Sequence, residues 1–398
     1  MFKREIDPES LVRDAATLVR FPSVIGLERE TLERLGEMAS ALGLEAELVE
    51  HDLAALRAHP AYPGEEASRS ELFGLTVTRR GPAGAPRLCL NGHVDVVAPG
   101  TEPWKHGPWS GAVEGGFLHG RGSLDMKGAV VAALHGLAAA GDSAACEVVL
   151  LAVASEEDGG LGAFAALERD DRYDACLVVE PTDFGVVCAQ GGALTFTGEV
   201  TGRGAHAAAR LEGASAIDAY VEIHAALAEH ERRLNADVAN PLMRKLELPY
   251  PVSVGRIEGG EWSSSVPDRL RFEGRLGVRV GESLGAAAGG LTEALRGHPV
   301  SLSFDGGRFG AGETPVDHPF TDLVREAFAE SAGERAPVRG VAYGADMRLF
   351  CDRDIPCVMA GTNGMVLAHA VDERVAVADL VRVAEGVRTV IERFPSIL

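Results

Sequence analysis

The sequence lacks several features that mark particular classes of protein. Its six cysteines include no C-x-x-C pair and lie mostly in apolar runs, which indicates reduced core residues, not a disulfide framework. No run approaches the roughly 20 apolar residues of a membrane span, and the opening MFKREIDPESLV lacks the apolar core of a signal peptide. We therefore expect a soluble, cytoplasmic protein.

Basic charge is also scarce. The chain has 59 Asp and Glu against 38 Lys and Arg, a formal net charge of −21. Such a surface repels nucleic acid and anionic membranes, so neither is an expected partner. The glycine-containing segment 120–123 lacks the GxxxxGK[ST] pattern of a phosphate loop. We interpret His106, with Trp104 and Trp109, as loop packing.

Apolar runs alternate with helical patterns through much of the chain. Near-continuous apolar strands are expected at 88–90, 147–154 and 175–179, with helices at 127–140 and 161–167. Strands that are apolar on both faces indicate a mostly parallel sheet covered by helices on both sides. The sequence therefore predicts a doubly wound α/β fold.

A different pattern begins at about residue 193. The order strand, helix, strand, strand, helix, strand fits a separate α+β domain of roughly 110 residues. The doubly wound pattern then resumes. We expect an inserted domain at 193–305, within a discontinuous larger domain formed by 1–192 and 306–398.

His93 follows the strand at 88–90, and Asp95 stands two positions later. In an extended chain this spacing places both side chains on one face. A metal-binding histidine usually needs a carboxylate or carbonyl on its other ring nitrogen. Asp95 is close enough in sequence to supply that contact.

Several more ligand-type residues follow strand ends or lie in glycine-marked loops. In parallel sheets, ligands gather beyond the carboxyl ends of the strands. Together with His93, the residues expected there are Asp125, Glu156, Glu157, Glu180 and His369. Imidazole and carboxylate ligands without thiolate suit Zn²⁺, with Co²⁺ or Mn²⁺ as substitutes. Two ions sharing one carboxylate would use this set and leave one carboxylate as a general base.

The motifs GHVDVV, GRGSLDMKG, SEEDGG, VVEPT and GRGAHAA, with the late His369 followed by Asp372-Glu373, occur in this order. As a set they resemble the signature of the acetylornithine deacetylase, succinyl-diaminopimelate desuccinylase and aminoacylase family. The similarity covers essentially the whole chain. It implies a zinc peptidase-like fold with an inserted ferredoxin-like lid or dimerisation domain.

The resemblance also implies roles for the ligand-type residues. His93 and Glu180 would bind one zinc ion, Glu157 and His369 the other, and Asp125 would bridge them.

Four further residues match functional positions of the family. Glu156 corresponds to the general base, and Asp95 to the residue that orients the first histidine ligand. His206 matches a histidine that, in dimeric relatives, reaches the neighbouring subunit's site and stabilises the oxyanion. Arg279 resembles the arginine that binds a substrate carboxylate.

One segment departs from the family pattern. Relatives often carry Asn before a Val-Pro pair, where this chain has GGEWSSSVP at 259–267. The polar contact to substrate would then come from Ser264 or a neighbour, which leaves the identity of the substrate open.

We therefore predict a metal-dependent amidohydrolase that removes an N-acyl group of the acetyl, succinyl or formyl type from a small amino-acid-like substrate. Water activated by two zinc ions would attack the amide, and a homodimer would form through the inserted domain. The alternatives are a metallo-dipeptidase or carboxypeptidase of the same family, acting on dipeptides, and a non-catalytic metal-binding paralogue.

Overall fold

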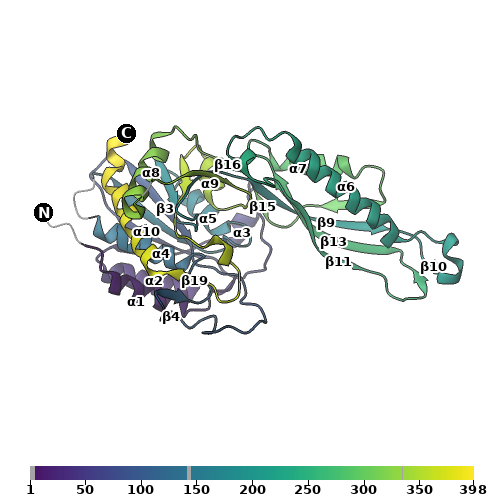
Figure 1. Ribbon diagram of the computed structural model, residues 1–398, viewed down its shortest axis with the longest axis horizontal. Helices are drawn as coiled ribbons and strands as arrows, with labels where there is room; N and C mark the ends of the chain where they lie inside the picture. The colour runs from purple at the N-terminus through teal and green to yellow at the C-terminus, as the bar shows by residue number, and fades with distance from the viewer. Residues whose placement is uncertain (1–4, 141–144, 334) are drawn as a thin grey trace. The chain divides into compact units, whose positions relative to one another are not determined.

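The chain packs as two units in a computed structural model that describes residues 5–140, 145–333 and 335–398 (Figure 1). The first four residues of the opening segment MFKREIDPESLV therefore lie outside the residues that the structure describes. The larger unit comprises Met1–Cys188, Glu313–Arg339 and Ala345–Leu398, and the smaller comprises Ala189–Gly312 and Gly340–Gly344.

The described residues of the larger unit build most of a nine-stranded sheet. Its order is β1-β2-β6-β3-β7-β18-β8-β16, and β17 pairs with β8. The strands are β1 (Glu45–Glu50), β2 (Phe73–Arg79), β3 (Arg87–His93), β6 (Glu147–Val153), β7 (Ala175–Val178), β8 (Val186–Gln190), β16 (Gly312–Glu313), β17 (Val338–Val341) and β18 (Cys357–Met359).

The centre of this sheet is parallel, and its flanks are antiparallel. Strands β6, β3, β7 and β18 pair in parallel, whereas β1, β2 and β8 join in antiparallel fashion. Nearly every residue of β3, β6 and β7 is buried, so both faces of the sheet are covered. The predicted doubly wound α/β class is confirmed.

Helices cover these strands. Helix α4 packs against α1 and α10, α10 also packs against α8, and α5 packs with α9 (Figure 1). The helices are α1 (Pro8–Val19), α2 (Arg29–Ala41), α3 (Leu53–Arg57), α4 (Lys127–Ala139), α5 (Leu161–Arg169), α8 (Pro319–Ala332), α9 (Met347–Cys351) and α10 (Val377–Arg393). Short 3-10 turns occur at η3 (Met365–Leu367) and η4 (Phe394–Ile397).

Close packing of α4 on β3 fixes the end of that strand. A Cβ atom at Gly92 would lie 2.7 Å from Val130 Cγ2, so a side chain here would push helix and strand apart. The glycine that precedes His93 is therefore required by the approach of the helix.

A small three-stranded sheet in the larger unit lies outside the predicted pattern. It has the order β19-β5-β4, from β4 (Ala112–Glu114), β5 (Phe117–His119) and β19 (Arg374–Ala376). Strands of three residues are too short to show a recognisable periodicity in sequence, which explains why this hairpin was not predicted.

The smaller unit consists of an antiparallel sheet with two helices and several short elements. Its sheet runs β11-β13-β9-β14 with antiparallel neighbours, β15 also pairs with β9, and α6 and α7 pack on the sheet. The elements are β9 (Gly192–Thr201), β10 (Ala205–His206), η1 (Ala207–Glu212), α6 (Ala216–Ala236), η2 (Met243–Lys245), β11 (Val252–Gly259), β12 (Ser265–Val266), β13 (Arg269–Val278), α7 (Leu284–Ala294), β14 (Val300–Ser303) and β15 (Arg308–Phe309).

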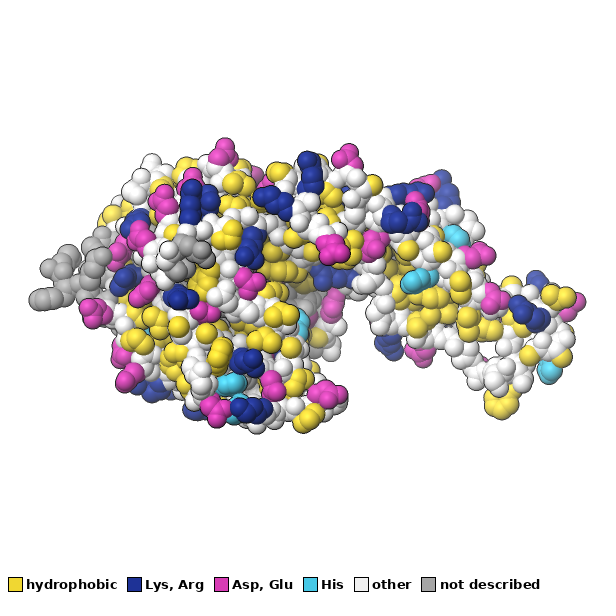
Figure 2. All heavy atoms as spheres, in the orientation of Figure 1, with side chains coloured by type: hydrophobic (Ala, Val, Ile, Leu, Met, Phe, Trp, Pro, Cys, Tyr) yellow, Lys and Arg dark blue, Asp and Glu magenta, His cyan; other side chains and the backbone are white. Residues whose placement is uncertain are grey.

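The surfaces of both units carry charged side chains of both signs, with hydrophobic side chains between them (Figure 2). Within the described ranges, no helix is both long enough and apolar enough to cross a lipid bilayer.

Candidate metal centre

His93 is the last residue of β3 and is 1% exposed. Its Nδ1 lies 2.9 Å from the backbone oxygen of Asp95. Because a carbonyl only accepts, Nδ1 donates to it, which leaves Nε2 as the ring nitrogen that would bind a metal ion. That nitrogen lies 3.1 Å from Asp125 Oδ1 and 3.8 Å from Glu180 Oε1. The sheet thus gathers one imidazole and two carboxylates.

A second group shares Asp125. His369 Nε2 lies 3.0 Å from Glu157 Oε1 and 3.5 Å from Asp125 Oδ2. The two oxygens of Asp125 therefore face different histidines. In each group, one ligand atom from every residue lies within 4.8 Å of the others.

The electrostatics of these residues favour a bound cation. Burial raises the pKa of Glu180 to about 8, and the neighbouring charge of Asp125 adds to this. Burial also raises the pKa of Glu157, against a hydrogen bond from His369. A metal ion would stabilise the ionised form of every carboxylate here. Nitrogen and oxygen donors with one shared carboxylate fit a pair of such ions.

Glu156 lies beside these groups without belonging to either. Burial raises the pKa of Glu156 well above its usual value; His93 lowers it, but the charge of Glu180 raises it further. Its Oε1 is buried and accepts no hydrogen bond from any described residue. A buried carboxylate with a raised pKa and a free oxygen is suited to accepting and returning a proton.

Asp95 contacts both His93 and the turn that carries Glu156 and Glu157. Its carbonyl holds His93, while its carboxylate accepts the backbone N–H groups of Glu156, at 3.3 Å, and Glu157, at 3.0 Å. The sequence suggested only the contact with the histidine. The carboxylate in addition fixes the turn that carries both glutamates.

Sequence reasoning missed a buried ion pair that supports the centre. Arg121 Nη1 contacts Glu373 Oε2, and Arg121 Nη2 donates to the backbone oxygen of His369 at 3.0 Å. Glu373 Oε1 accepts the backbone N–H groups of Leu124 and Asp125, at 2.9 and 3.2 Å. The pair therefore joins the two loops that carry Asp125 and His369. The sequence offered one indication of this pair: Arg121 lies in the motif GRGSLDMKG, and Glu373 lies in the Asp372-Glu373 pair that follows His369.

Residues 89–393 match the family described as Peptidase family M20/M25/M40. The chain belongs to this family.

Similar proteins agree with this assignment. A succinyl-diaminopimelate desuccinylase of Methylorubrum populi is 30% identical over 408 residues, covering 96% of this chain and 97% of the relative. An M20 family metallo-carboxypeptidase from Sulfolobus solfataricus has a TM-score of 0.76 at 16% identity, covering 97% of this chain and 99% of that one. A dinuclear metal-binding M20 peptidase of Bacillus subtilis has a TM-score of 0.67 at 15% identity, with 98% and 99% covered. The family resemblance read from the motifs is confirmed, and with it metal-dependent hydrolysis of an amide bond.

Two of the predicted site residues, His206 and Ser264, lie in the smaller unit of this M20 chain and have exposed side chains. His206 ends β10 and is exposed, and its Nδ1 accepts the Ala208 N–H at 3.1 Å. Ser264 is also exposed, and its backbone oxygen accepts the Ala207 N–H at 2.9 Å. His206 lines a pocket of about 690 Å³ within this unit, together with Trp262 and residues of β12 and β13.

Arg279 has contacts different from those expected of a substrate-binding residue. Its guanidinium donates to the backbone oxygens of Leu234, at 2.7 and 3.0 Å, and Arg233, at 2.9 Å. These carbonyls lie in the last turn of α6, where backbone oxygens lack partners within the helix. In this structure Arg279 caps α6.

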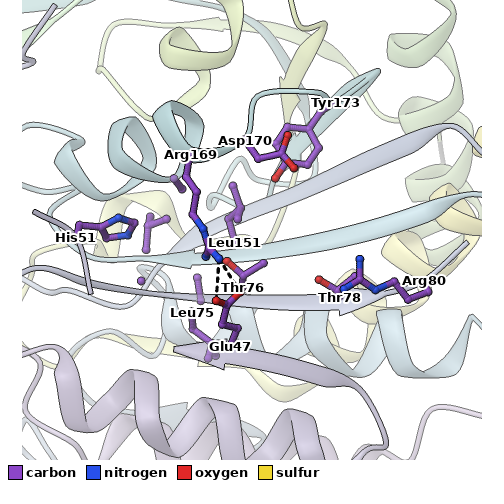
Figure 3. Close-up of a pocket in the computed structure, with 14 residues that line it drawn as sticks. Glu47, His51, Leu75, Thr76, Thr78, Arg80, Leu151, Arg169, Asp170 and Tyr173 are labelled. Carbon is purple, nitrogen blue, oxygen red and sulfur yellow. Dashed lines mark hydrogen bonds and ion pairs between the residues drawn. The ribbon is translucent and has the colours of Figure 1, made fainter. Parts of the chain in front are cut away.

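A separate pocket of about 160 Å³ in the larger unit lies over β1, β2 and β6 (Figure 3). Arg169 donates to both oxygens of Glu47, at 2.7 and 2.9 Å. Burial lowers the pKa of His51 to about 4, so its ring is neutral at pH 7. None of the predicted site residues lines this pocket.

Proposed function

We propose that this M20 chain is a di-zinc amidohydrolase that removes an acyl group from the nitrogen of a small amino-acid-like substrate. His93 and Glu180 would hold one ion, Glu157 and His369 the other, and Asp125 both. The observation that carries the proposal is the placement of Asp125, whose two oxygens face the two histidines at 3.1 and 3.5 Å. Co²⁺ or Mn²⁺ would substitute for Zn²⁺ at these ligands.

Bound metal ions supply Lewis acidity, which polarises the substrate carbonyl and lowers the pKa of water. Glu156 takes a proton from the water molecule as its oxygen adds to the amide carbon. The C–N bond then breaks, and Glu156 returns the proton to the departing nitrogen. The products are a carboxylic acid and a free amine. Asp95 holds Glu156 and His93 in place for these transfers.

The acyl group to test first is succinyl. Curated relatives that share 30% identity over nearly the whole chain carry the name succinyl-diaminopimelate desuccinylase. Acetyl and formyl groups remain in the comparison, because the 259–267 segment departs from the family pattern. A role for Ser264 as a polar contact to substrate belongs to this proposal.

We further propose a homodimer formed through the smaller unit. Strand β11 is an exposed edge of its sheet, and edge strands are ready to pair with another chain. Exposed hydrophobic side chains lie on this strand, on α6 and nearby, with Val221 65%, Ile257 53% and Trp262 70% exposed. In such a dimer, His206 of one subunit would donate to the oxyanion in the other. The predicted cytoplasmic location fits the six cysteines, all of them free thiols.

The decisive experiment is an assay of N-succinyl, N-acetyl and N-formyl amino acids and of dipeptides, with added Zn²⁺ or Co²⁺. We expect hydrolysis of at least one acyl amino acid, loss of activity with a chelator, and recovery on returning the metal. Glu156→Gln is the catalytic control, because it keeps the size of the side chain and removes its proton chemistry. Hydrolysis that resists chelation would overturn the proposal.

Two other outcomes identify the alternatives. Cleavage of dipeptides alone indicates a metallo-dipeptidase. Binding of two metal ions without hydrolysis of any compound indicates a non-catalytic paralogue, against which the buried free oxygen of Glu156 argues.

A further inference from the structure

The larger unit holds another cluster of metal-ligand side chains, at the β4–β5 hairpin. His106 Nε2 lies 3.1 Å from Glu114 Oε2. The rings of His106 and His119 have centroids 4.4 Å apart. One ligand atom from each of the three residues lies within 4.8 Å of the others. No residue of this cluster belongs to the metal centre described above.

We propose that His106, Glu114 and His119 form a third metal site, for a divalent cation of the Zn²⁺ type. Two imidazoles and one carboxylate are a typical donor set for such ions, and water completes the coordination. The sequence suggested loop packing for His106, because the hairpin that brings the other two ligands to it was not predicted.

The register of the hairpin explains why two of the ligands meet. His119 stands opposite Ala112, and Phe117 stands opposite Glu114. Alternate residues of a strand share a face, and so do directly opposed residues, so Glu114 and His119 are diagonal neighbours on one face. His119 also pairs with Arg374 of β19, which makes β5 the central strand of its sheet. Two of the three ligands are thus placed by backbone pairing.

The third ligand has an unused nitrogen directed at this point. His106 Nε2 is buried and makes no hydrogen bond with any described residue, although Glu114 Oε2 is near. A buried nitrogen without a hydrogen bond is costly unless another partner satisfies it. A cation between the imidazole and the carboxylate supplies that partner.

The charged neighbours of the cluster permit metal binding. Lys105 Nζ lies 2.8 Å from Glu114 Oε2, and both side chains are more than half exposed. Exposed ion pairs contribute little to stability, so this lysine is a weak competitor. Lys105 lowers the pKa of Glu114, and burial lowers the pKa of His119. Both shifts favour the deprotonated forms that bind metals.

A cation at the hairpin site would stabilise the loops next to the metal centre that contains Asp125. Gly120, next to His119, donates its N–H to the backbone oxygen of Glu373 at 3.0 Å. The N–H of Lys105 donates to Asp372 Oδ1 at 2.7 Å. A cation held by the hairpin would therefore tie the 106 loop and β5 to the segment that carries Glu373. This role is structural.

The test measures the metal content of the full chain after equilibrium dialysis against Zn²⁺ alone, and the absorption of bound Co²⁺ alone. Wild type is expected to hold about three equivalents, and His119→Gln or Glu114→Gln about two, because the site loses a ligand. Glu114 is exposed, so its variant is expected to fold. His59→Gln is the matched control, because His59 lies 3.4 Å from Glu168 but belongs to no three-ligand group among the described residues. It should keep the wild-type content.

A chain carrying Asp125→Asn separates this site from the main centre. We expect that chain to keep about one equivalent and to lose it when Glu114→Gln is added. That result supports the third site even if the proposed function fails. Equal metal content in wild type and in both hairpin variants, whatever its value, would overturn the proposal.

Discussion

Most candidate residues of the larger unit are buried, although His369 is exposed, whereas two of the three candidates in the smaller unit are exposed. In the larger unit, His93, Glu156 and Glu180 are no more than 7% exposed, and their neighbours fix their orientation. In the smaller unit, His206 and Ser264 are exposed, and their only described contacts are local backbone ones. The first set is preorganised by one chain. Under the proposed function, the second set would act on a substrate bound at the metal centre of a partner subunit.

This difference separates two kinds of contribution to catalysis. Groups that bind ions or move protons gain from burial, because a low dielectric strengthens their interactions. Groups that reach a substrate from outside must stay accessible until the site closes. Variants in the two units should therefore differ in which measured quantity changes: kcat, metal content, KM or the free energy of unfolding.

The largest effect is expected for Glu156→Gln. General acid–base catalysis contributes about 10²- to 10⁴-fold, so kcat should fall by about that factor while the metal content stays unchanged. Steady-state kinetics and metal analysis of the same preparation check this. Glu168→Gln, on an exposed part of α5, serves as the control. A Glu156 variant that lost its metal as well would show that Glu156 is a ligand.

His206→Gln should have the next largest effect. Loss of one oxyanion donor lowers kcat by about 10²- to 10³-fold, and the metal content should not change. His298→Gln, in the same unit, is the control. Mixing His206→Gln chains with Glu156→Gln chains should restore part of the activity, because a hybrid dimer contains one site with both residues intact. Mixtures that stay inactive would show that His206 does not act across subunits.

Asp95→Asn tests the preorganisation of the larger unit. The backbone oxygen that holds His93 remains. The two carboxylate oxygens of Asp95 each accept one N–H group, from Glu156 and Glu157, whereas the asparagine amide has one oxygen and can accept only one of them. Loss of such outer contacts typically costs about 10- to 100-fold in metal affinity or activity. Activity measured against metal concentration would detect the change. Asp171→Asn, on an exposed loop, is expected to match wild type.

The sequence predicted the centre best where the fold is most regular. Strands β3, β6 and β7 each contain a short apolar run, so their positions are visible in the sequence; His93 ends β3, and Glu156 and Glu180 follow β6 and β7. Asp125 and His369 lie in loops without such a pattern. Their positions beside the other ligands come from the structure, and the roles of all these residues remain proposals.

Contacts between distant segments could not be predicted in the same way. Arg121 and Glu373 are 252 positions apart, and nothing in either motif specifies the partner. The β4–β5 hairpin gave no periodic signal, so the approach of His106 to His119 depends on tertiary packing. Arg279 directly follows β13, and the nearness of the end of α6 was not visible in the sequence.

The smallest effect is expected for Arg279→Gln, and it bears directly on the contrast between the units. The guanidinium donates to the backbone oxygens of Arg233 and Leu234, so its removal leaves the end of α6 without a cap. Hydrogen bonds from a charged donor contribute about 1.5–3 kcal/mol, and the free energy of unfolding should fall by about that amount. KM should stay unchanged. Chemical denaturation and steady-state kinetics on one preparation separate the two possibilities. A raised KM with unchanged stability would instead support the substrate-binding role suggested by the resemblance, and would show that a residue of the smaller unit acts on the substrate although its contacts in this structure are with α6.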